Sequence, residues 1–154
     1  MMAGRETSKG SGAGGQTPRV TPEEFREMGR IGAVYYEQGS LTKAQAVFES
    51  LVELDPSSAA AHSALGALLT RRERYADALP HLDRAVELDP GQIAPYVNRA
   101  EIFIRQGRAQ EAVENLKSAI ALDPKEKDPA ANRARAMAFG LAEALKAHGV
   151  KAQQ

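Results

Sequence analysis

The chain contains no cysteine and no tryptophan, and aromatic residues make up only 5% of its 154 positions. The absence of cysteine excludes disulfides, thiol catalysis and cysteine-based zinc sites. Because aromatic side chains are scarce, small residues must do much of the packing. Hydrophobic residues still make up 43% of the chain, which is enough for the core of one domain.

Neither sign of charge is in excess, since 20 Lys and Arg residues balance 20 Asp and Glu residues. Proteins that bind nucleic acid usually carry a concentrated basic excess, so we expect no nucleic acid partner. The sequence also lacks the long apolar run of a membrane-spanning helix and the apolar core of a secretory signal. We therefore expect a cytoplasmic protein that does not insert into a membrane.

Residues 1–20 are rich in glycine and poor in apolar side chains. Such a segment cannot bury enough apolar surface to offset the entropy of ordering, so we predict a disordered tail over 1–20 and a disordered C-terminus over 149–154. Residues 10–17 have the spacing of a phosphate-binding loop, but Gln16 replaces the lysine that would reach the phosphates. We interpret this stretch as a linker.

A period of 34 residues organises the rest of the chain. Pro56, Pro90 and Pro124 each close the same phrase, which reads Glu-Leu-Asp-Pro twice and Ala-Leu-Asp-Pro the third time. A fixed period of this length is typical of stacked helical hairpins. We therefore predict a domain over residues 21–148 that contains repeat units over 25–58, 59–92 and 93–126.

Small residues recur where the two helices of a unit must cross closely. With the closing proline as position 32 of each unit, positions 8 and 20 hold Gly32, Gly66, Ala100, Ala44, Ala78 and Ala112. Large apolar residues three or four positions away complete one apolar stripe on each helix. The turn at position 15 holds Gly39 and Gly107, which suit a left-handed residue, whereas the second unit has Glu73 there.

Several helix starts carry recognisable signals. Thr21, Pro22 and Glu24 form a capping box with proline at the first helical position. Pro80 lies early in a second helix, where we expect its missing amide to cost little. Asp128 precedes a seventh helix, predicted over 129–147, with an apolar stripe from Ala134 to Leu145. We interpret this helix as a cap over the last unit; the alternative is a helix that docks a partner.

These residues, in register three times over about residues 23–124, resemble the tetratricopeptide repeat. The resemblance implies an all-α fold: a right-handed superhelical solenoid of three helix-turn-helix units plus a C-terminal capping helix. It also implies a concave groove lined by the first helix of each unit. From it we predict peptide-binding residues, which are Arg26, Arg30, Ala33, Tyr36, Ser63, Ala64, Ala67, Arg71, Val97, Asn98, Glu101, Ile104 and Arg105.

Small side chains such as Ala33, Ser63, Ala64 and Ala67 line the floor of this groove, which leaves room for a helix or an extended segment. Arg26, Arg30, Arg71 and Arg105 edge the groove, and they are either donors to a bound peptide or ordinary solvated arginines. Tetratricopeptide co-chaperones that grip the C-terminal carboxylate of heat-shock proteins use Lys, Arg and Asn at positions where this chain has Gly29, Ala33, Ala64, Ala94 and Asn98. A free carboxylate would therefore lack most of its partners, so we do not expect that function.

A second resemblance concerns the third unit and the last helix. Pro95-Tyr96, Arg99-Ala100-Glu101, Gly107-Arg108 and the segment from Asp128 to Leu145 are similar to the class II type III secretion chaperones. That resemblance implies a groove that takes an extended client segment in the bacterial cytoplasm. The family's N-terminal dimerisation helix is replaced here by the glycine-rich tail, so a homodimer and a monomer both remain open.

No arrangement of residues points to catalysis or metal binding. None of His62, His81 and His148 has the helical spacing to other ligands that a metal site uses, and no nucleophile arrangement is recognisable. We predict a non-enzymatic protein without a cofactor, most concretely a chaperone or adaptor that holds a client segment in its concave groove. The alternative is a scaffold that positions partners in a bacterial motility, secretion or envelope assembly. Ala67→Arg together with Val97→Asp is expected to abolish partner binding without unfolding the chain.

Overall fold

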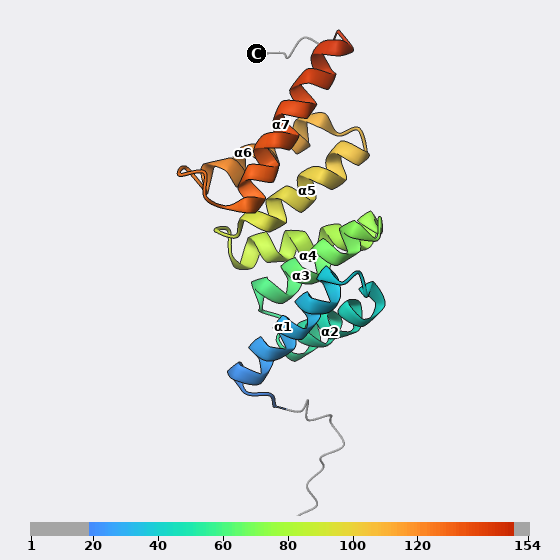
Figure 1. The fold of residues 1–154 in the computed structure, drawn as a ribbon, viewed down its shortest axis with the longest axis vertical. Coiled ribbons are helices and arrows are strands. Elements are labelled where there is room, and N and C mark those ends of the chain that lie inside the picture. Colours follow the sequence, from blue (N-terminus) through green and yellow to red (C-terminus); the bar gives the residue numbers. More distant parts are fainter. Residues whose placement is uncertain (1–18, 150–154) are drawn as a thin grey trace, which may run out of the picture.

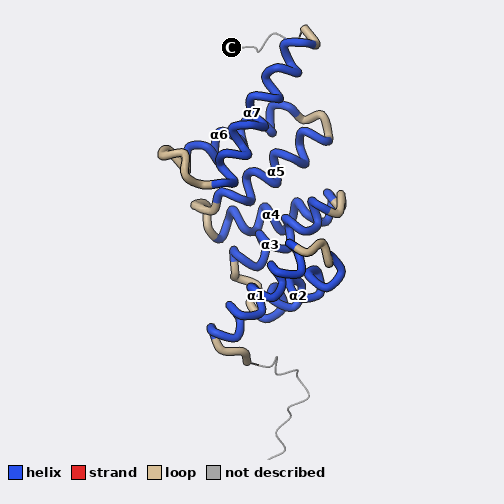
Figure 2. The backbone as a smooth tube through the Cα atoms, in the orientation of Figure 1, coloured by secondary structure: helices blue, strands red, loops and turns tan. Residues whose placement is uncertain are grey.

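The computed structural model describes residues 19–149, and in that range the chain folds into α-helices joined by short loops, with no strand (Figures 1 and 2). Residues 1–18 and 150–154, which hold nearly all of the two predicted disordered segments, lie outside the described residues. The division of the chain into tail, domain and terminus therefore stays a prediction. No helix of the described range is long and apolar enough to cross a membrane.

Six of the seven described helices form three antiparallel pairs, and the seventh packs on the last pair. The pairs stack along the long axis of the molecule, with α1 and α2 at one end and α7 at the other (Figure 1). The prediction of an all-α right-handed solenoid with a final capping helix is confirmed. The helices are α1 (Pro22–Glu37), α2 (Leu41–Leu54), α3 (Ala59–Arg71), α4 (Tyr75–Leu88), α5 (Ile93–Arg105), α6 (Ala109–Ala121) and α7 (Pro129–Ala147).

The predicted capping box is present at the start of α1. The Thr21 hydroxyl accepts a hydrogen bond from the Glu24 amide at 3.1 Å, and the Glu24 carboxylate accepts one from the Thr21 amide at 2.7 Å. Two hydrogen bonds with Thr21 lower the pKa of Glu24. The bond with the Thr21 backbone amide has the larger effect, and the bond with the Thr21 side chain the smaller. The first helix therefore begins where the sequence indicates.

The small residues predicted at the helix crossings are in close contact with the partner helix. A Cβ atom added at Gly66 would lie 2.5 Å from Leu82 Cδ2, and one added at Gly32 would meet the Phe48 ring. Ala44, Ala78, Ala100 and Ala112 are completely buried. Larger residues at these positions would separate the two helices of a pair.

The turns inside the three pairs share a left-handed residue, as predicted for the two glycines. Gly39 has φ +76°, Gly107 has φ +73° and Glu73 has φ +59°. Glu73 therefore adopts the same turn as the glycines although its Cβ makes that conformation unfavourable. The turn geometry is preserved in the second pair despite the absence of glycine.

The aspartate of the repeated phrase closes the loop that leads into the next pair. Asp55 Oδ1 accepts the Ser57 amide at 3.0 Å, and Asp89 Oδ1 accepts the Gly91 amide at 3.0 Å. The Asp123 carboxylate accepts the amides of Lys127 at 3.2 Å and Asp128 at 3.1 Å. The period seen in the sequence is therefore a period of side chain-to-backbone hydrogen bonds at the loops.

Pro80 is not at a helix start. It is the sixth residue of α4, beyond the first turn, so the carbonyl of Ala76 cannot receive the amide that another residue would supply. The expectation that Pro80 lies near a helix start is therefore wrong, and we now expect its missing amide to cost stability. The side chain of Pro80 is exposed, and no tertiary packing compensates for the missing hydrogen bond.

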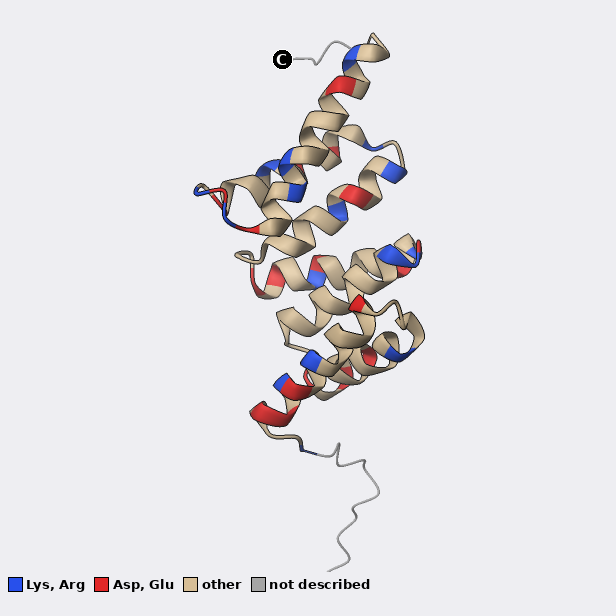
Figure 3. Cartoon of the chain, in the orientation of Figure 1, with Lys and Arg blue, Asp and Glu red and all other residues tan. Residues whose placement is uncertain are grey.

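The two ends of the solenoid differ. Leu65 and Leu68 of α3 are 3% and 0% exposed, but the equivalent Ile31 and Val34 of α1 are 43% and 49% exposed because no earlier pair within residues 19–149 covers them. At the other end, α7 buries Ala134 against α5 and α6. Charged residues are spread over the helices rather than gathered on one, and every helix except α3 carries both signs (Figure 3).

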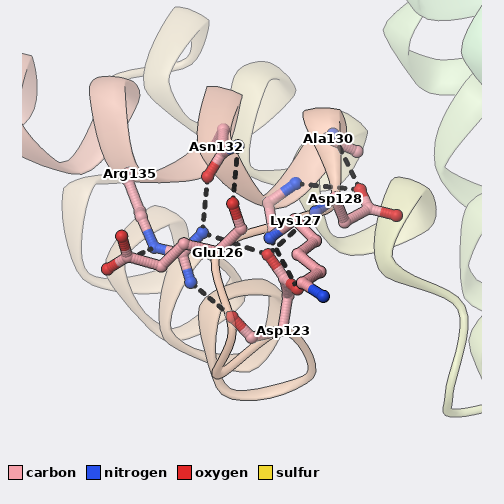
Figure 4. Close-up of polar contacts among 8 residues, drawn as sticks. Asp123, Glu126, Lys127, Asp128, Ala130, Asn132 and Arg135 are labelled. Atoms are coloured by element: carbon pink, nitrogen blue, oxygen red, sulfur yellow. Dashed lines mark hydrogen bonds and ion pairs between the residues drawn. The ribbon is translucent and has the colours of Figure 1, made fainter.

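A polar cluster ties α7 to the third pair (Figure 4). Arg135 of α7 donates to the Asp123 carbonyl from Nη2 at 2.5 Å and to the Asp123 carboxylate from Nη1 at 3.2 Å. Burial alone would raise the pKa of Asp123, but the amides of Asp128 and Lys127 and the Arg135 guanidinium lower it further than burial raises it. The negative charge of Asp123 therefore helps to hold α7 in place.

We expect the docking of α7 to be acid-sensitive. The pKa of Asp123 is lower in the fold than its ordinary value of 3.8, so its stabilising effect is complete above pH 3.8 and is lost as the pH falls through the lowered value. Hydrogen-exchange protection of the α7 amides should then fall relative to that of α3. Asp123→Asn should lower protection at neutral pH and remove this part of the pH dependence. An equal acid response in Asp123→Asn would contradict the assignment.

Candidate functional site

The first helices of the pairs and α7 line a common groove. One cavity in it, of about 280 Å³, takes residues from four helices: Tyr36 from α1, Ala67, Thr70 and Arg71 from α3, Asn98 and Glu101 from α5, and Arg133 from α7. Five of these seven were predicted as peptide-binding residues. The structure therefore places these five residues around one cavity, and their contact with a partner stays a prediction.

A second cavity, of about 470 Å³, lies between α5 and α7. Its walls are mainly apolar side chains, and it is lined by Glu101, Ile104, Arg105, Arg133, Met137, Gly140, Leu141 and Ala144. Three of these residues, Glu101, Ile104 and Arg105, were predicted. The other five belong to α7.

An ion pair separates the two cavities. Arg133 of α7 contacts the Glu101 carboxylate of α5, and both residues line both cavities. The cavities therefore adjoin along the groove, and a segment that filled both would run past this pair.

The remaining predicted residues lie in three different environments. Ser63 lines a third cavity, of about 310 Å³, near the N-terminal ends of α5 and α7. Arg26, Arg30 and Ala33 are exposed on α1, and Ala64 packs against the core of the first two pairs. That any of these residues contacts a ligand stays a prediction.

Val97 does not face the groove. It is 1% exposed and packs in the core with Ala100, Leu116, Ala119 and Ala134. Its placement in the groove was therefore wrong, and we now expect Val97→Asp to unfold part of the chain. The neighbouring Asn98 is also nearly buried, at 9% exposed, although it reaches the first cavity.

Arg71 contacts its own chain. Its Nη1 donates to the Tyr36 carbonyl at 2.7 Å, and its guanidinium carbon lies 4.8 Å from the centre of the Tyr36 ring. This contact joins the ends of α1 and α3 and fixes the aromatic side chain at the groove. Arg71 is thus at least partly a structural residue and not one of the freely solvated arginines considered above.

The other three arginines differ from Arg71. Arg30 contacts Glu27 one turn earlier on the same exposed helix, with Nε donating at 2.8 Å. Arg105 sits at the rim of the second cavity, and within residues 19–149 it pairs with no carboxylate. Arg26 is exposed on α1.

That α7 lines the groove was not predicted from the sequence. The angle at which α7 crosses α5 cannot be deduced from the repeat pattern, because α7 lies outside the repeats. The predicted stripe from Ala134 to Leu145 does face the third pair, and Met137 and Leu141 reach both the core and the second cavity. One sequence signal could have indicated the second cavity. Gly140 and Ala144, two small residues one helical turn apart, leave a shallow surface beside the apolar stripe of α7.

Two sequence models, each described as tetratricopeptide repeat, match the chain, one over residues 30–93 and the other over residues 69–138. Together they cover most of the described helices. The chain belongs to the tetratricopeptide repeat family. A search among curated proteins found no relative of this sequence.

Solved structures share the fold of this tetratricopeptide repeat chain at low sequence identity. The type III secretion translocator chaperone SycD of Yersinia enterocolitica is 18% identical with a TM-score of 0.75, over 83% of this chain and 90% of that chain. PcrH of Pseudomonas aeruginosa is 24% identical with a TM-score of 0.72, over 80% and 96%. The structure of PcrH bound to the chaperone-binding region of PopD is 24% identical with a TM-score of 0.72, over 80% of this chain and 95% of that chain. The resemblance to class II secretion chaperones is therefore confirmed at the level of the fold.

One polar contact of this tetratricopeptide repeat chain was not predicted. His62 Nδ1 of α3 lies 3.1 Å from His81 Nδ1 of α4, and His62 Nε2 lies 2.8 Å from the Pro56 carbonyl. Because a carbonyl can only accept, we assign the His62 proton to Nε2, so His81 donates to His62. Burial, and then the neighbouring His62, lower the pKa of His81. The described residues hold no group of three or more metal-ligating side chains, and we interpret this pair as a structural link.

Proposed function

We propose that this chain is a non-enzymatic cytoplasmic chaperone or adaptor that holds a segment of a client protein in its concave groove. The observation that carries the proposal is the pair of adjoining cavities along α1, α3, α5 and α7, one of about 280 Å³ and one of about 470 Å³. Cavities of this size suit a few side chains of a segment rather than a whole domain.

The solved relatives support the same reading. The PcrH structure with the chaperone-binding region of PopD has a fold of this kind with a protein segment bound. The present groove differs from a carboxylate clamp, because Ala33 and Ala64 offer no cationic donor and Arg71 is engaged with Tyr36. We therefore infer that apolar and backbone contacts, more than a terminal carboxylate, hold the client.

The experiment is a pull-down of the tagged full chain from its native cell, with mass spectrometry of what is retained. Ala67→Arg extends a charged side chain into the first cavity beside Arg71, and the matched control Ala46→Arg places the same charge on an exposed position of α2. We expect Ala67→Arg to lower client capture by about tenfold, which corresponds to about 1.4 kcal/mol, and Ala46→Arg to leave it unchanged.

The outcome also separates a chaperone from a scaffold. A chaperone should retain a client that is insoluble when it is produced alone, whereas two partners that are stable alone and bind together would indicate a scaffold. Light scattering of the purified complex gives its stoichiometry; a homodimer would use the bare face of α1 around Ile31 and Val34. Equal capture by the two variants would show that the concave groove is not the binding site.

A further inference from the structure

The cavity between α5 and α7, which we call the α5–α7 pocket, has an apolar floor. Ile104, Met137 and Leu141 are all partly buried, so their apolar surface remains accessible in it. A Cβ atom added at Gly140 would meet no other atom within 4 Å, so the glycine opens one side of the pocket. Its volume of about 470 Å³ falls within the range of about 300–1,000 Å³ seen in ligand pockets.

The rim of the α5–α7 pocket carries a net positive charge. Three charged residues line it, and two of them, Glu101 and Arg133, neutralise each other. The third, Arg105, has no carboxylate within 4 Å among the residues that the structure describes. An apolar group with one negative charge beside it therefore complements this pocket in both shape and charge.

We propose that the α5–α7 pocket binds a large apolar side chain of a client protein, with the carboxylate of an adjacent Asp or Glu residue of the client paired to Arg105. This inference rests on the proposed function, because it assigns one part of the groove to one part of the client. It specifies which side chains the client segment should present at that end of the groove: a large apolar residue next to an Asp or Glu.

The ends of the chain outside the described residues do not carry such a segment in their sequence, since the one acidic residue of residues 1–18 is Glu6, between Arg5 and Thr7. Residues 150–154 contain Lys151 and no Asp or Glu. The exposed large apolar residues of a second copy are Ile31, Val34, Leu122 and Phe139. Among these only Leu122 has an Asp or Glu as its direct neighbour in the chain, and that residue, Asp123, is buried and bound to Arg135. The occupant with the required chemistry is therefore another protein.

Two matched dyes test the pocket without an identified client. The anionic dye 1-anilinonaphthalene-8-sulfonate carries an aromatic group and one sulfonate, and N-phenyl-1-naphthylamine is the same molecule without the sulfonate. We expect both to bind the full-length chain, the anionic dye more tightly. Gly140→Leu, which fills the pocket and favours the helix, should weaken both dyes at least about tenfold. Gly140→Ala, which adds a single methyl group, and Ala142→Leu, on an exposed position outside the pocket, should not.

Arg105→Gln should weaken the anionic dye about threefold and leave the neutral dye unchanged, because exposed ion pairs contribute modestly. Unchanged dye binding in Gly140→Leu, or an equal effect of Arg105→Gln on both dyes, would overturn the proposal. Tighter dye binding after removal of residues 150–154 would also overturn it, since the chain's own end would then cover the pocket. Ala67→Arg lies outside the pocket and should leave dye binding intact, so a failure here is distinct from a failure of the client-binding proposal.

Discussion

Val97→Asp should unfold the C-terminal half of the solenoid, whereas Ile104→Asp should leave it folded. Val97 is 1% exposed in the cluster that joins α5, α6 and α7, so an aspartate there would bury a carboxylate without a partner. An uncompensated buried charge costs about 3–5 kcal/mol, which is a large part of the roughly 5–15 kcal/mol that stabilises a typical domain. Ile104, about two helical turns further along α5, lines the groove and is only partly buried.

The two variants carry the same new charge on the same helix, so they differ mainly in burial. Urea unfolding followed by circular dichroism should show a large loss of stability for Val97→Asp and a loss below about 1 kcal/mol for Ile104→Asp. In a stacked array the damage should be confined to α5, α6 and α7 and spare the first pair, which hydrogen exchange would resolve. If the two variants unfolded at the same urea concentration, the assignment of Val97 to the core would be wrong.

The reason Val97 was misplaced is specific to the last pair. It occupies the same repeat position as Gly29 and Ser63, which are only partly buried in the first two pairs. In the third pair, α7 packs across α5, and Ala134 of α7 joins the cluster around Val97. The repeat pattern describes the contacts within each pair of helices. It contains no information on how a helix outside the repeat packs on the last pair.

Local signals in the sequence were reliable where a single side chain decides a backbone conformation. The capping box at Thr21 and the left-handed turns at Gly39 and Gly107 are present as predicted. The close crossings at Gly32 and Gly66 follow for the same reason, since only a missing Cβ permits the approach of Phe48 and Leu82. Each of these features depends on residues close in sequence or within one pair of helices.

Side-chain contacts between different helices could not be predicted in the same way. The link from His62 to His81, the bridge from Arg71 to the Tyr36 carbonyl and the pair of Glu101 with Arg133 all join different helices. Their side chains are long enough to reach several partners, and the choice among these partners depends on how the helices stack. The groove was therefore predicted as a surface, while its division into two cavities was visible only in the structure.

Pro80→Ala should raise the stability of the chain, although it removes a residue that the fold already accommodates. Proline at the sixth position of α4 deprives the helix of one hydrogen bond and places its ring against the preceding turn, at about 3 kcal/mol relative to alanine. Part of this gain is lost through the unfolded state. Alanine gives the unfolded chain more conformational freedom than proline does, which lowers the free energy of unfolding by about 0.4–1 kcal/mol. We therefore expect a net increase of about 2 kcal/mol in the free energy of unfolding.

Pro22→Ala is the matched control, since Pro22 is the first residue of α1, where an amide would have no partner within the helix. The same substitution there should leave stability unchanged or lower it by less than about 1 kcal/mol through the unfolded state alone. Urea unfolding of the three proteins measures both values. A gain in Pro80→Ala with none in Pro22→Ala would show that the proline inside α4 costs stability that the proline at the start of α1 does not. A loss in Pro80→Ala would mean instead that the proline ring itself contributes to the fold.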